Sequence, residues 1–569
     1  MMLSDIEIAY RAEMKPIVEI ARQLGLEEDE IELHGKYIAK INLSVLERLA
    51  DRPNGKLISV TAITPTPLGE GKTVTALGLG MALHRLGKKV CNTMREPSKG
   101  PTFGIKGGAT GSGYAQVLPM VEINLMFTGD IPAVEAAHNL LAAAIDAHIL
   151  HGNKLGIDPL EVTWTRCVDL NDRALRQVVI GLGGRANGYP RQTGYDITVA
   201  TETAAIHSLT TSLKDLRQRL GRIVIGFTYD GKPVTAEDLK VAGAMTALMK
   251  DSIKPNLCQS LEHHPVIIHG FPFANVAHGN NSVLADMVAL KLADYVVTES
   301  GFGADCGFEK LVDVKCRLSG LKVDLAVIVA SIRALKLHGG AFEFRPGQSY
   351  ESIKELAERE NPEAVERGCE NLAWHIGIAK KLGIPAVVAL NRFTSDHESE
   401  IEVVRRKALE AGADGFAVSE CWAKGGEGAI DLAKEVVRVL DEKPAQMRLL
   451  YPDDLSIEEK IRILAREIYN AEDVEFSSLA MRKIELYTKF GWDRFPINMA
   501  KTHLSISHDP NWKNVPSGYI FPIRDIRASV GAGFLYPIAG EMQTMPGLPS
   551  RPAFMDVDID EEGKVVGIF

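Results

Sequence analysis

The chain has 569 residues and a mass of 62.0 kDa, enough for about three or four domains of ordinary size. Apolar residues make up 46% and charged residues 24%, and these globular proportions exclude collagen-like and disordered classes. The net charge is −10 and the isoelectric point is about 5.9, so the charge balance disfavours a nucleic-acid partner.

The sequence contains no candidate membrane segment and no secretory signal. Its most apolar stretch, residues 133–150, is interrupted by acidic and histidine side chains and falls short of the ~20 residues that span a membrane. The first residues, MMLSDIEIAYRAEMKP, lack a basic segment followed by an apolar one. The seven cysteines are widely spaced without a CxxC pair, which predicts reduced, mostly buried thiols in a cytoplasmic protein and argues against zinc or disulfides.

The chain begins with helical periodicity and continues as a βαβ unit. Residues 1–52 are predicted to be helical, because apolar residues recur at helical spacing before a Pro-Asn-Gly break. Residues 56–63 (KLISVTAI) have the continuous apolarity of a buried parallel strand. A Gly/Pro-rich turn, a helix over 73–86 and a second strand over 89–96 follow. This order of elements predicts a parallel sheet.

Five further apolar runs predict that the sheet continues. With helical stretches between most of them, they favour an α/β fold with a P-loop-type, mostly parallel, doubly wound sheet. The runs are HPVIIHG (264–270), DYVVTES (294–300), DLAVIVAS (324–331), IPAVVALN (384–391) and DGFAVSE (414–420).

Two segments depart from this alternation and predict additional domains. One holds short strands, helices and a tight turn at 229–232, which is typical of an α+β insertion. The other has two helices and a Pro/Gly-rich tail, which predicts a smaller C-terminal α+β domain. The expected division is 1–154 for the N-terminal helices and first part of the sheet domain, 155–250 for the insertion, 251–445 for the second part of the sheet domain with the loops that follow its later strands, and 446–569 for the C-terminal domain.

The most informative motif joins the first strand to the next helix. Its glycines let backbone N–H groups surround phosphate oxygens, and the helix N-terminus adds positive partial charge. Lys72 can reach terminal phosphates, and the Thr73 hydroxyl can ligate Mg²⁺. Thr66 stands where the common GxxxxGK[ST] pattern has glycine, so an ordinary turn before a helix is the alternative. The candidate nucleotide-binding residues are Thr64, Pro65, Thr66, Pro67, Leu68, Gly69, Glu70, Gly71, Lys72 and Thr73.

Further candidates follow other predicted strands. Arg95 ends the second strand and is placed to bind an anion, with a salt bridge to Glu96 or another acid as the alternative. Phe393 and Trp422 follow two later strands and can stack on a flat heterocycle, although most aromatic residues belong to the core. The glycine-rich run 104–113 either brings backbone close to a ligand or forms a mobile loop.

The histidines show no helical metal-binding spacing, and we expect them to be hydrogen-bonded or exposed. This group comprises His263, His264, His269 and His278.

Over nearly its whole length the chain resembles formate–tetrahydrofolate ligases, also called 10-formyltetrahydrofolate synthetases. The departure at Thr66 is part of that family's own phosphate loop. The resemblance rests on TPTPLGEGKT (64–73), REPSKGPTFGIKGGATGSGY (95–114), NLLAAAIDAHI (139–149), DLNDRALR (169–176), GYDITVA (194–200), AGAMTALMKDSIKPNL (242–257), FPFANVAHGNNSV (271–283), LADYVVTESGFGADCGFEK (292–310), VALNRF (388–393), WAKGGEG (422–428) and TMPGLP (544–549).

The resemblance implies a two-stage reaction. ATP phosphorylates formate, and the N10 amine of tetrahydrofolate then attacks formyl phosphate, giving 10-formyltetrahydrofolate, ADP and phosphate. It also implies Mg²⁺ with ATP, activation by a monovalent cation, and a homotetramer that acts on small molecules without nucleic-acid or membrane partners.

The same resemblance implies roles for particular residues. Lys72 and Arg95 are the expected catalytic residues, with Arg95 holding formyl phosphate. Phe393 and Trp422 are expected to sandwich the pterin, with Phe302 nearby. The resemblance assigns no general base.

One departure from the family leaves two alternatives open. Related sequences carry histidines where this chain has Met126 and Pro132, so either those histidines are dispensable or the chain is a paralogue with altered activity. The intact phosphate loop, Arg95 and aromatic pair favour an active ligase. Two rival functions are a P-loop ATPase switch or assembly factor without folate chemistry, and a folate-binding scaffold that has lost catalysis.

Overall fold

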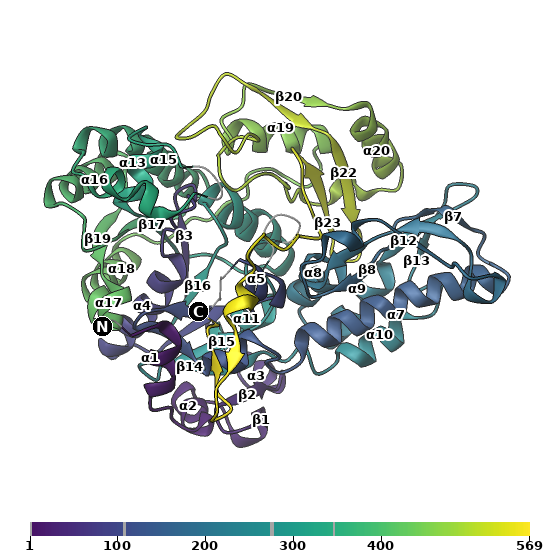
Figure 1. Ribbon diagram of the computed structural model, residues 1–569, viewed down its shortest axis with the longest axis horizontal. Coiled ribbons are helices and arrows are strands. Elements are labelled where there is room, and N and C mark those ends of the chain that lie inside the picture. The colour runs from purple at the N-terminus through teal and green to yellow at the C-terminus, as the bar shows by residue number, and fades with distance from the viewer. Residues whose placement is uncertain (1–2, 106–109, 273–277, 345–347, 569) are drawn as a thin grey trace.

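One large sheet organises the protein, for which a computed structural model describes residues 3–105, 110–272, 278–344 and 348–568 (Figure 1). Seven of its strands are parallel neighbours, and β3 lies at the centre of the seven. The prediction of an α/β fold with a large, mostly parallel sheet is confirmed. In spatial order the seven are β15 (Pro265–Ile268), β4 (Val90–Met94), β16 (Tyr295–Glu299), β3 (Lys56–Ala62), β17 (Leu325–Ala330), β18 (Ala386–Asn391) and β19 (Gly415–Ser419).

Helices cover both faces of this sheet. Along β17, Leu325, Val327 and Val329 pack into one apolar cluster, and the residues between them pack into the other. Burial on both faces explains why the parallel strands are continuously apolar. On one face lie α4 (Lys72–Arg85), α17 (Cys421–Lys424) and α18 (Ile430–Glu442); on the other lie α11 (Val283–Leu292), α13 (Ile332–His338), α15 (Pro362–Lys381) and α16 (Glu398–Glu410).

An antiparallel edge extends the sheet beyond β15 and corrects the prediction for residues 1–52. That region contains α1 (Asp5–Arg11), α2 (Ile17–Leu24) and α3 (Ser44–Arg48), but also a hairpin of β1 (Ile31–His34) and β2 (Ile38–Ile41). The hairpin forms because β2 pairs with β14 (Asn256–Ser260), more than 200 residues away, and no local pattern reports that pairing. β14 also pairs with β6 (Ala115–Leu118), which in turn pairs with β5 (Gly111–Ser112).

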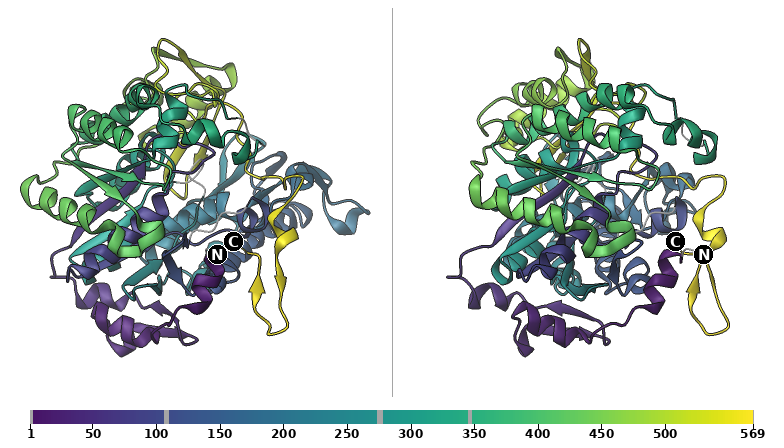
Figure 2. Two further views of the ribbon diagram at one scale, coloured as in Figure 1. Left: turned by 60° about the vertical axis from the view of Figure 1, so that its left-hand side comes forward. Right: turned by 90° about the vertical axis from the view of Figure 1, so that its left-hand side faces the viewer.

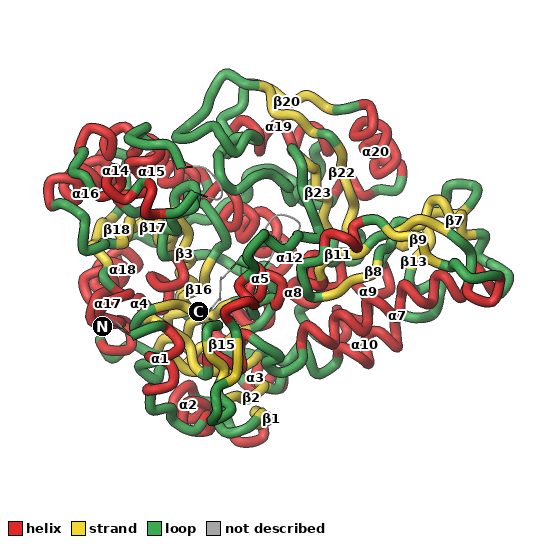
Figure 3. The backbone as a smooth tube through the Cα atoms, viewed as in Figure 1, coloured by secondary structure: helices red, strands yellow, loops and turns green. Residues whose placement is uncertain are grey.

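The segment predicted as an insertion, together with the preceding helix α7, forms an arm to the right of the sheet in Figures 1 and 3. The predicted tight turn at 229–232 is confirmed, because it joins antiparallel strands β12 and β13. The arm contains β7 (Ile157–Val162), β8 (Arg166–Val168), β9 (Val178–Ile180), β10 (Arg191–Thr193), β11 (Tyr195–Ile197), β12 (Val224–Thr228), β13 (Pro233–Thr235), α7 (Asp130–Leu150), α8 (Glu202–Leu209), α9 (Leu213–Arg222) and α10 (Ala242–Met249).

The C-terminal region has the two predicted helices, α19 (Ile457–Glu467) and α20 (Ser478–Lys489), followed by short strands. Its last hairpin returns to the N-terminus (Figure 2), where the Tyr10 hydroxyl donates to the Val565 carbonyl at 2.9 Å. The four domain boundaries remain predictions. The strands are β20 (Asp473–Phe476), β21 (Ile520–Ile523), β22 (Asp525–Ser529), β23 (Phe534–Ile538), β24 (Asp558–Ile559) and β25 (Val565–Val566).

Two smaller expectations can also be compared with the structure. All seven cysteines are free and buried, as predicted. Among the described residues, no helix is both long and apolar enough to cross a membrane. The helix that contains residues 133–150, α7, instead packs against α10.

Candidate functional site

The turn between β3 and α4 is closed by contacts within itself. Lys72 is the first residue of α4, and Gly71 before it has a φ of 81°, in the left-handed region that favours glycine. A side chain at Gly71 would also collide with the amide of Asn391. Glu70 accepts hydrogen bonds from the backbone N–H and the hydroxyl of Thr66, at 2.7 and 3.0 Å. Burial raises the pKa of Glu70.

Buried side chains from two helices hold the start of this turn at Thr64. Asn371 accepts from the Thr64 N–H at 3.0 Å and donates to its hydroxyl at 2.9 Å, and His375 Nε2 lies 3.0 Å from the same hydroxyl. His338 Nε2 lies 3.0 Å from the Thr64 carbonyl oxygen. Burial lowers the pKa of His338 and of His375 to about 4, so both are neutral near pH 7. The turn is therefore anchored by uncharged groups.

Glu299 joins two predicted site residues that come from different elements. Its carboxylate accepts from the Thr73 hydroxyl at 2.7 Å and from Arg95 Nη2 at 3.2 Å. The meeting follows from the topology, because β16 lies between β3 and β4 and all three run parallel. Arg95 thus pairs with Glu299 and not with Glu96. Of the salt bridges considered for Arg95, the one observed is to a more distant acid. We did not predict Glu299 as a site residue, although an acid at the end of a buried strand was a visible signal.

The three predicted aromatic residues have different neighbours. Phe302 has a φ of 60° and stacks on His503, with ring centroids 4.2 Å apart. The guanidinium of Arg333 lies 3.7 Å from the centre of the Phe393 ring, and Arg333 also donates to the Leu68 carbonyl at 2.7 Å. Phe393 is therefore tied to the phosphate-loop candidate through Arg333.

Trp422 lies in α17, just after β19, and its side chain is 41% exposed. β18 and β19 are parallel neighbours, so Phe393 and Trp422 belong to the same edge of the sheet. Within the described ranges, no ring contact joins Phe393 to Trp422.

The C-terminal region supplies a site neighbour that the sequence analysis missed. His503 covers one face of Phe302, and burial together with the nearby charges of Lys501 and Lys72 lowers its pKa to about 4. Lys501 pairs with the buried Asp305 at 2.7 Å. No sequence signal could have placed His503 there, because it lies about 200 residues from Phe302 along the chain.

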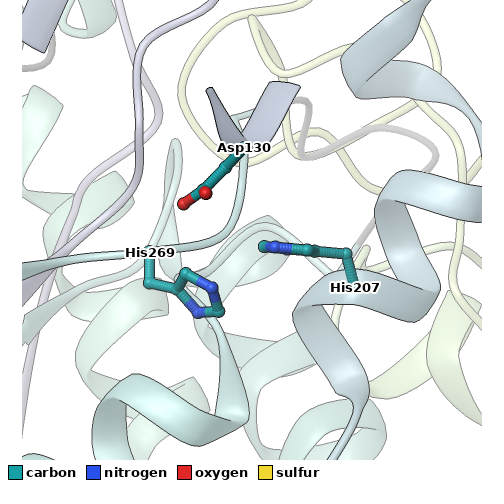
Figure 4. Close-up of side chains that lie close together, drawn as sticks. All are labelled: Asp130, His207 and His269. Atoms are coloured by element: carbon teal, nitrogen blue, oxygen red, sulfur yellow. The ribbon is translucent and has the colours of Figure 1, made fainter. Parts of the chain in front are cut away.

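Asp130, His207 and His269 point toward a common centre (Figure 4), although each comes from a different element. Both histidines donate from Nε2 to the Ser252 carbonyl, at 2.9 and 2.7 Å. Asp130 is neutralised by Lys40 at 2.7 Å. The ammonium of Lys40 would repel a metal ion beside Asp130, so the cluster is best described as a buried hydrogen-bonded group. This agrees with the expectation for His269.

Two predicted features lie partly outside the described residues. The glycine-rich run 104–113 includes 106–109, and the segment 271–283 includes 273–277. Met126 and Pro132 are both described. Met126 is 60% exposed, and Pro132 lies in the first turn of α7, where a missing N–H is tolerated.

Comparisons with known proteins agree over the full chain. Residues 3–569 match the family model described as formate–tetrahydrofolate ligase. The chain is 62% identical over 566 residues to the formate–tetrahydrofolate ligase of Desulforamulus reducens, covering 100% of this chain and 99% of that one. It is 57% identical to the enzyme of the same name from Roseiflexus sp. strain RS-1 and 56% identical to that of Roseiflexus castenholzii, with 100% of both chains covered in each case.

Proposed function

Because the chain belongs to the formate–tetrahydrofolate ligase family, we propose that it uses ATP to join formate to tetrahydrofolate, forming 10-formyltetrahydrofolate, ADP and phosphate. One observation carries the proposal at the level of the site. Lys72 and Thr73 at the start of α4, Arg95 after β4 and Glu299 at the end of β16 come together at one edge of the sheet. In α/β sheets, this carboxyl edge is where ligands bind.

The β3–α4 turn is the proposed phosphate-binding loop of a doubly wound, P-loop-type sheet. The N-terminus of α4 has free N–H groups and a positive partial charge, and Lys72 adds a full positive charge. Residues 64–73 would surround the phosphates of ATP. The anchoring of Thr64 supports this role, since a preorganised loop does not have to reorganise when the ligand binds.

Thr73 and Glu299 fit a Mg²⁺ ion that accompanies ATP. Mg²⁺ prefers hard oxygen ligands and usually takes one or two from the protein. The Thr73 hydroxyl and a Glu299 carboxylate oxygen lie 2.7 Å apart, which puts two such oxygens on one side of the proposed phosphate site. When bound, the ion would neutralise charge on the phosphates.

The proposed route passes through formyl phosphate. Formate is a poor electrophile because its carboxylate is already negative, and a phosphoryl group provides a leaving group. Lys72 would stabilise the transferring phosphoryl group, and Arg95 would hold the formyl phosphate with its planar guanidinium. Arg95 is 16% exposed and its described acidic partner is Glu299, so an anion could share or replace that partner.

Phe393 and Trp422 are the proposed surfaces for the pterin of tetrahydrofolate. They follow neighbouring strands, and the exposed fraction of Trp422 leaves part of its ring free to stack. Phe302 would contribute only the face that His503 does not cover.

The monovalent cation, the homotetramer and the cytoplasmic location remain predictions from the resemblance. The buried Glu96 does not fit a cation site. Burial and the nearby charge of Asp130 raise the pKa of Glu96, which favours its neutral form, and the ammonium groups of Lys40 and Lys99 lie close by.

The decisive experiment measures 10-formyltetrahydrofolate formed by the purified protein from formate, ATP and tetrahydrofolate. We expect product only when all three are present, and ADP release that depends on both formate and tetrahydrofolate. ATP hydrolysis that ignores both would instead support the ATPase switch. Folate binding without ATP binding, measured by calorimetry, would support the inactive scaffold.

A further inference from the structure

A cavity of about 540 Å³ lies beside α5 (Lys99–Gly104), the helix that begins four residues after Arg95. We call it the α5 pocket. It lies among α5, the segment 168–175 and the C-terminal residues 548 and 554. Its walls are mainly apolar, and the apolar residues are Phe103, Val168, Leu170, Leu175, Leu548 and Phe554.

The polar side of the α5 pocket is held by buried groups. Asp169 accepts from the Ser98 hydroxyl at 2.7 Å and from the Lys99 N–H at 2.9 Å, which fixes the start of α5 to the segment 168–175. Asn171, also in the pocket wall, is 5% exposed, and its Oδ1 has no partner among the described residues. A side chain at Gly100 would collide with Asn171, so glycine permits this close approach. Asn171 Oδ1 is therefore packed against Gly100 of α5 and helps to fix the pocket wall.

Arg173 supplies positive charge at the pocket. Its Nη2 donates to the carbonyl of Leu548, which holds the guanidinium against the wall. Lys99 is neutralised by Asp169 at 3.0 Å, whereas Arg173 forms no ion pair within the described parts of the chain. A guanidinium with spare donors suits a carboxylate.

The position of the pocket narrows the choice of ligand. In tetrahydrofolate the N10 atom, which accepts the formyl group, is bonded directly to an aryl ring that continues through an amide to glutamate. That end of the molecule must leave the site beside the formyl group, which Arg95 is proposed to hold. Arg95 is the first residue of the β4–α5 turn, and Lys99, which follows the turn, lines the α5 pocket.

We propose that the α5 pocket binds the aryl-glutamate end of tetrahydrofolate. The apolar walls take the aryl ring and the glutamate methylenes, and Arg173 pairs with a glutamate carboxylate. This inference rests on the proposed function and adds to it a second binding region, separate from the pterin surfaces.

The test compares wild type with Arg173→Ala on two substrates, tetrahydrofolate and tetrahydropteroate, which lacks the glutamate. Arg173 is exposed, so the variant should fold. We expect the KM for tetrahydrofolate to rise about tenfold, as for the loss of one hydrogen bond to a charged group. The KM for tetrahydropteroate and for ATP should stay unchanged. Arg173→Lys should recover part of the loss, and Arg185→Ala, at another exposed arginine of the arm, is the matched control.

An unchanged KM for tetrahydrofolate, or an equal rise for both folate substrates, would overturn the proposal. Calorimetric titration with p-aminobenzoyl-glutamate provides a readout that does not depend on activity. Binding to wild type that weakens in Arg173→Ala would support the pocket even if wild type formed no product, a result that would refute the proposed function alone. No binding to wild type at millimolar ligand would refute the pocket even in an active ligase.

Discussion

Two sets of polar side chains lie at the same edge of the sheet and differ in burial and bonding. The anchor set is buried, and its members bond to one another or to backbone around Thr64. The ligand set is partly exposed, and two of its members, Thr73 and Arg95, bond to the carboxylate of a third, Glu299. The anchor set is Thr64, His338, Asn371 and His375, and the ligand set is Lys72, Thr73, Arg95 and Glu299.

This difference distinguishes residues that fix the shape of the site from residues that would bind its ligands. A buried polar group that loses its partner costs about 1–3 kcal/mol, so the anchor set is fixed in one arrangement. A partly exposed group can exchange its partner for water or ligand at little cost. We therefore expect changes in the ligand set to reduce activity while stability is kept, and changes in the anchor set to reduce stability.

Lys72→Ala should have the largest effect, and only on activity. Removing a preorganised positive charge from a phosphoryl site costs roughly 10²–10³ in kcat. The measurement is initial rate of 10-formyltetrahydrofolate formation together with the denaturant midpoint. Lys434→Ala is the matched control, because that lysine is 63% exposed on α18. Turnover within a few-fold of wild type would remove the β3–α4 turn from the proposed site.

Asn371→Leu should have the largest effect on stability. The variant leaves the N–H of Thr64 and the carbonyl of Asn514 without the partners they have at 3.0 and 2.8 Å. We expect the free energy of unfolding, measured by urea titration, to fall by about 3 kcal/mol. Lys380→Ala, at a side chain of the same helix that is 43% exposed, should change stability by less than about 0.5 kcal/mol. An equal loss of stability in both variants would show that the anchor set contributes no more to stability than an exposed residue does.

Glu299→Gln tests the member of the ligand set that joins the others. The amide keeps the shape of the side chain but removes the charge that suits Mg²⁺ and Arg95. We expect the Mg²⁺ concentration for half-maximal activity to rise about 10–100-fold, with unfolding little changed. Glu427→Gln, at a side chain 69% exposed, is the control. A normal Mg²⁺ dependence would show that Glu299 only positions Arg95.

His375→Gln should change the pH dependence of stability. The folded-state pKa of His375 is about 4 and the unfolded value about 6.5, so between these pH values the unfolded state binds the extra proton. Wild-type stability from this group is therefore full above about pH 6.5 and is lost as pH falls toward 4. Burial raises the pKa of Glu202 to about 7, so Glu202 makes the free energy of unfolding change with pH in the opposite direction. Because Glu202 is present in both proteins, the difference between variant and wild type reports His375 alone.

The expected difference is a slope of stability against pH that is shallower in His375→Gln by about 1.4 kcal/mol per pH unit between pH 6 and 4.5. Urea titrations at three pH values measure it. Parallel slopes in the two proteins would show that His375 is already protonated in the folded state.

Met126→His should have the smallest effect. Because residue 126 is 60% exposed, an imidazole there gains little from the fold and titrates near its usual pKa. We expect kcat/KM to change by less than about threefold from pH 6 to 8, since the side chain lies in solvent. An inactive wild type rescued about a hundredfold by this change would instead identify the chain as a diverged paralogue.

Sequence reasoning worked best where a signal is local. The strand at 56–63, the turn and the helix that follows appear as β3, the turn and α4 within one or two residues, because continuous apolarity, glycine and helix composition are properties of adjacent residues. It failed at β1 and β2, where pairing with β14 turns an expected helical region into a hairpin.

The site shows the same contrast: local motifs were predicted from the sequence, whereas partners that are distant along the chain were not. The sequence by itself determined the parallel α/β sheet and, through the resemblance, the family. It also predicted Lys72, Thr73, Arg95, Phe393 and Trp422 as site candidates, because each follows a recognisable strand or glycine turn, and Phe302 through the resemblance alone. Only the tertiary structure decided that Glu299 joins Thr73 to Arg95, that His503 covers Phe302 and that Asn371 holds Thr64. The physical reason is that strand order is set by packing across the whole sheet, and residues about 200 to 300 positions apart become neighbours without any trace in the local pattern.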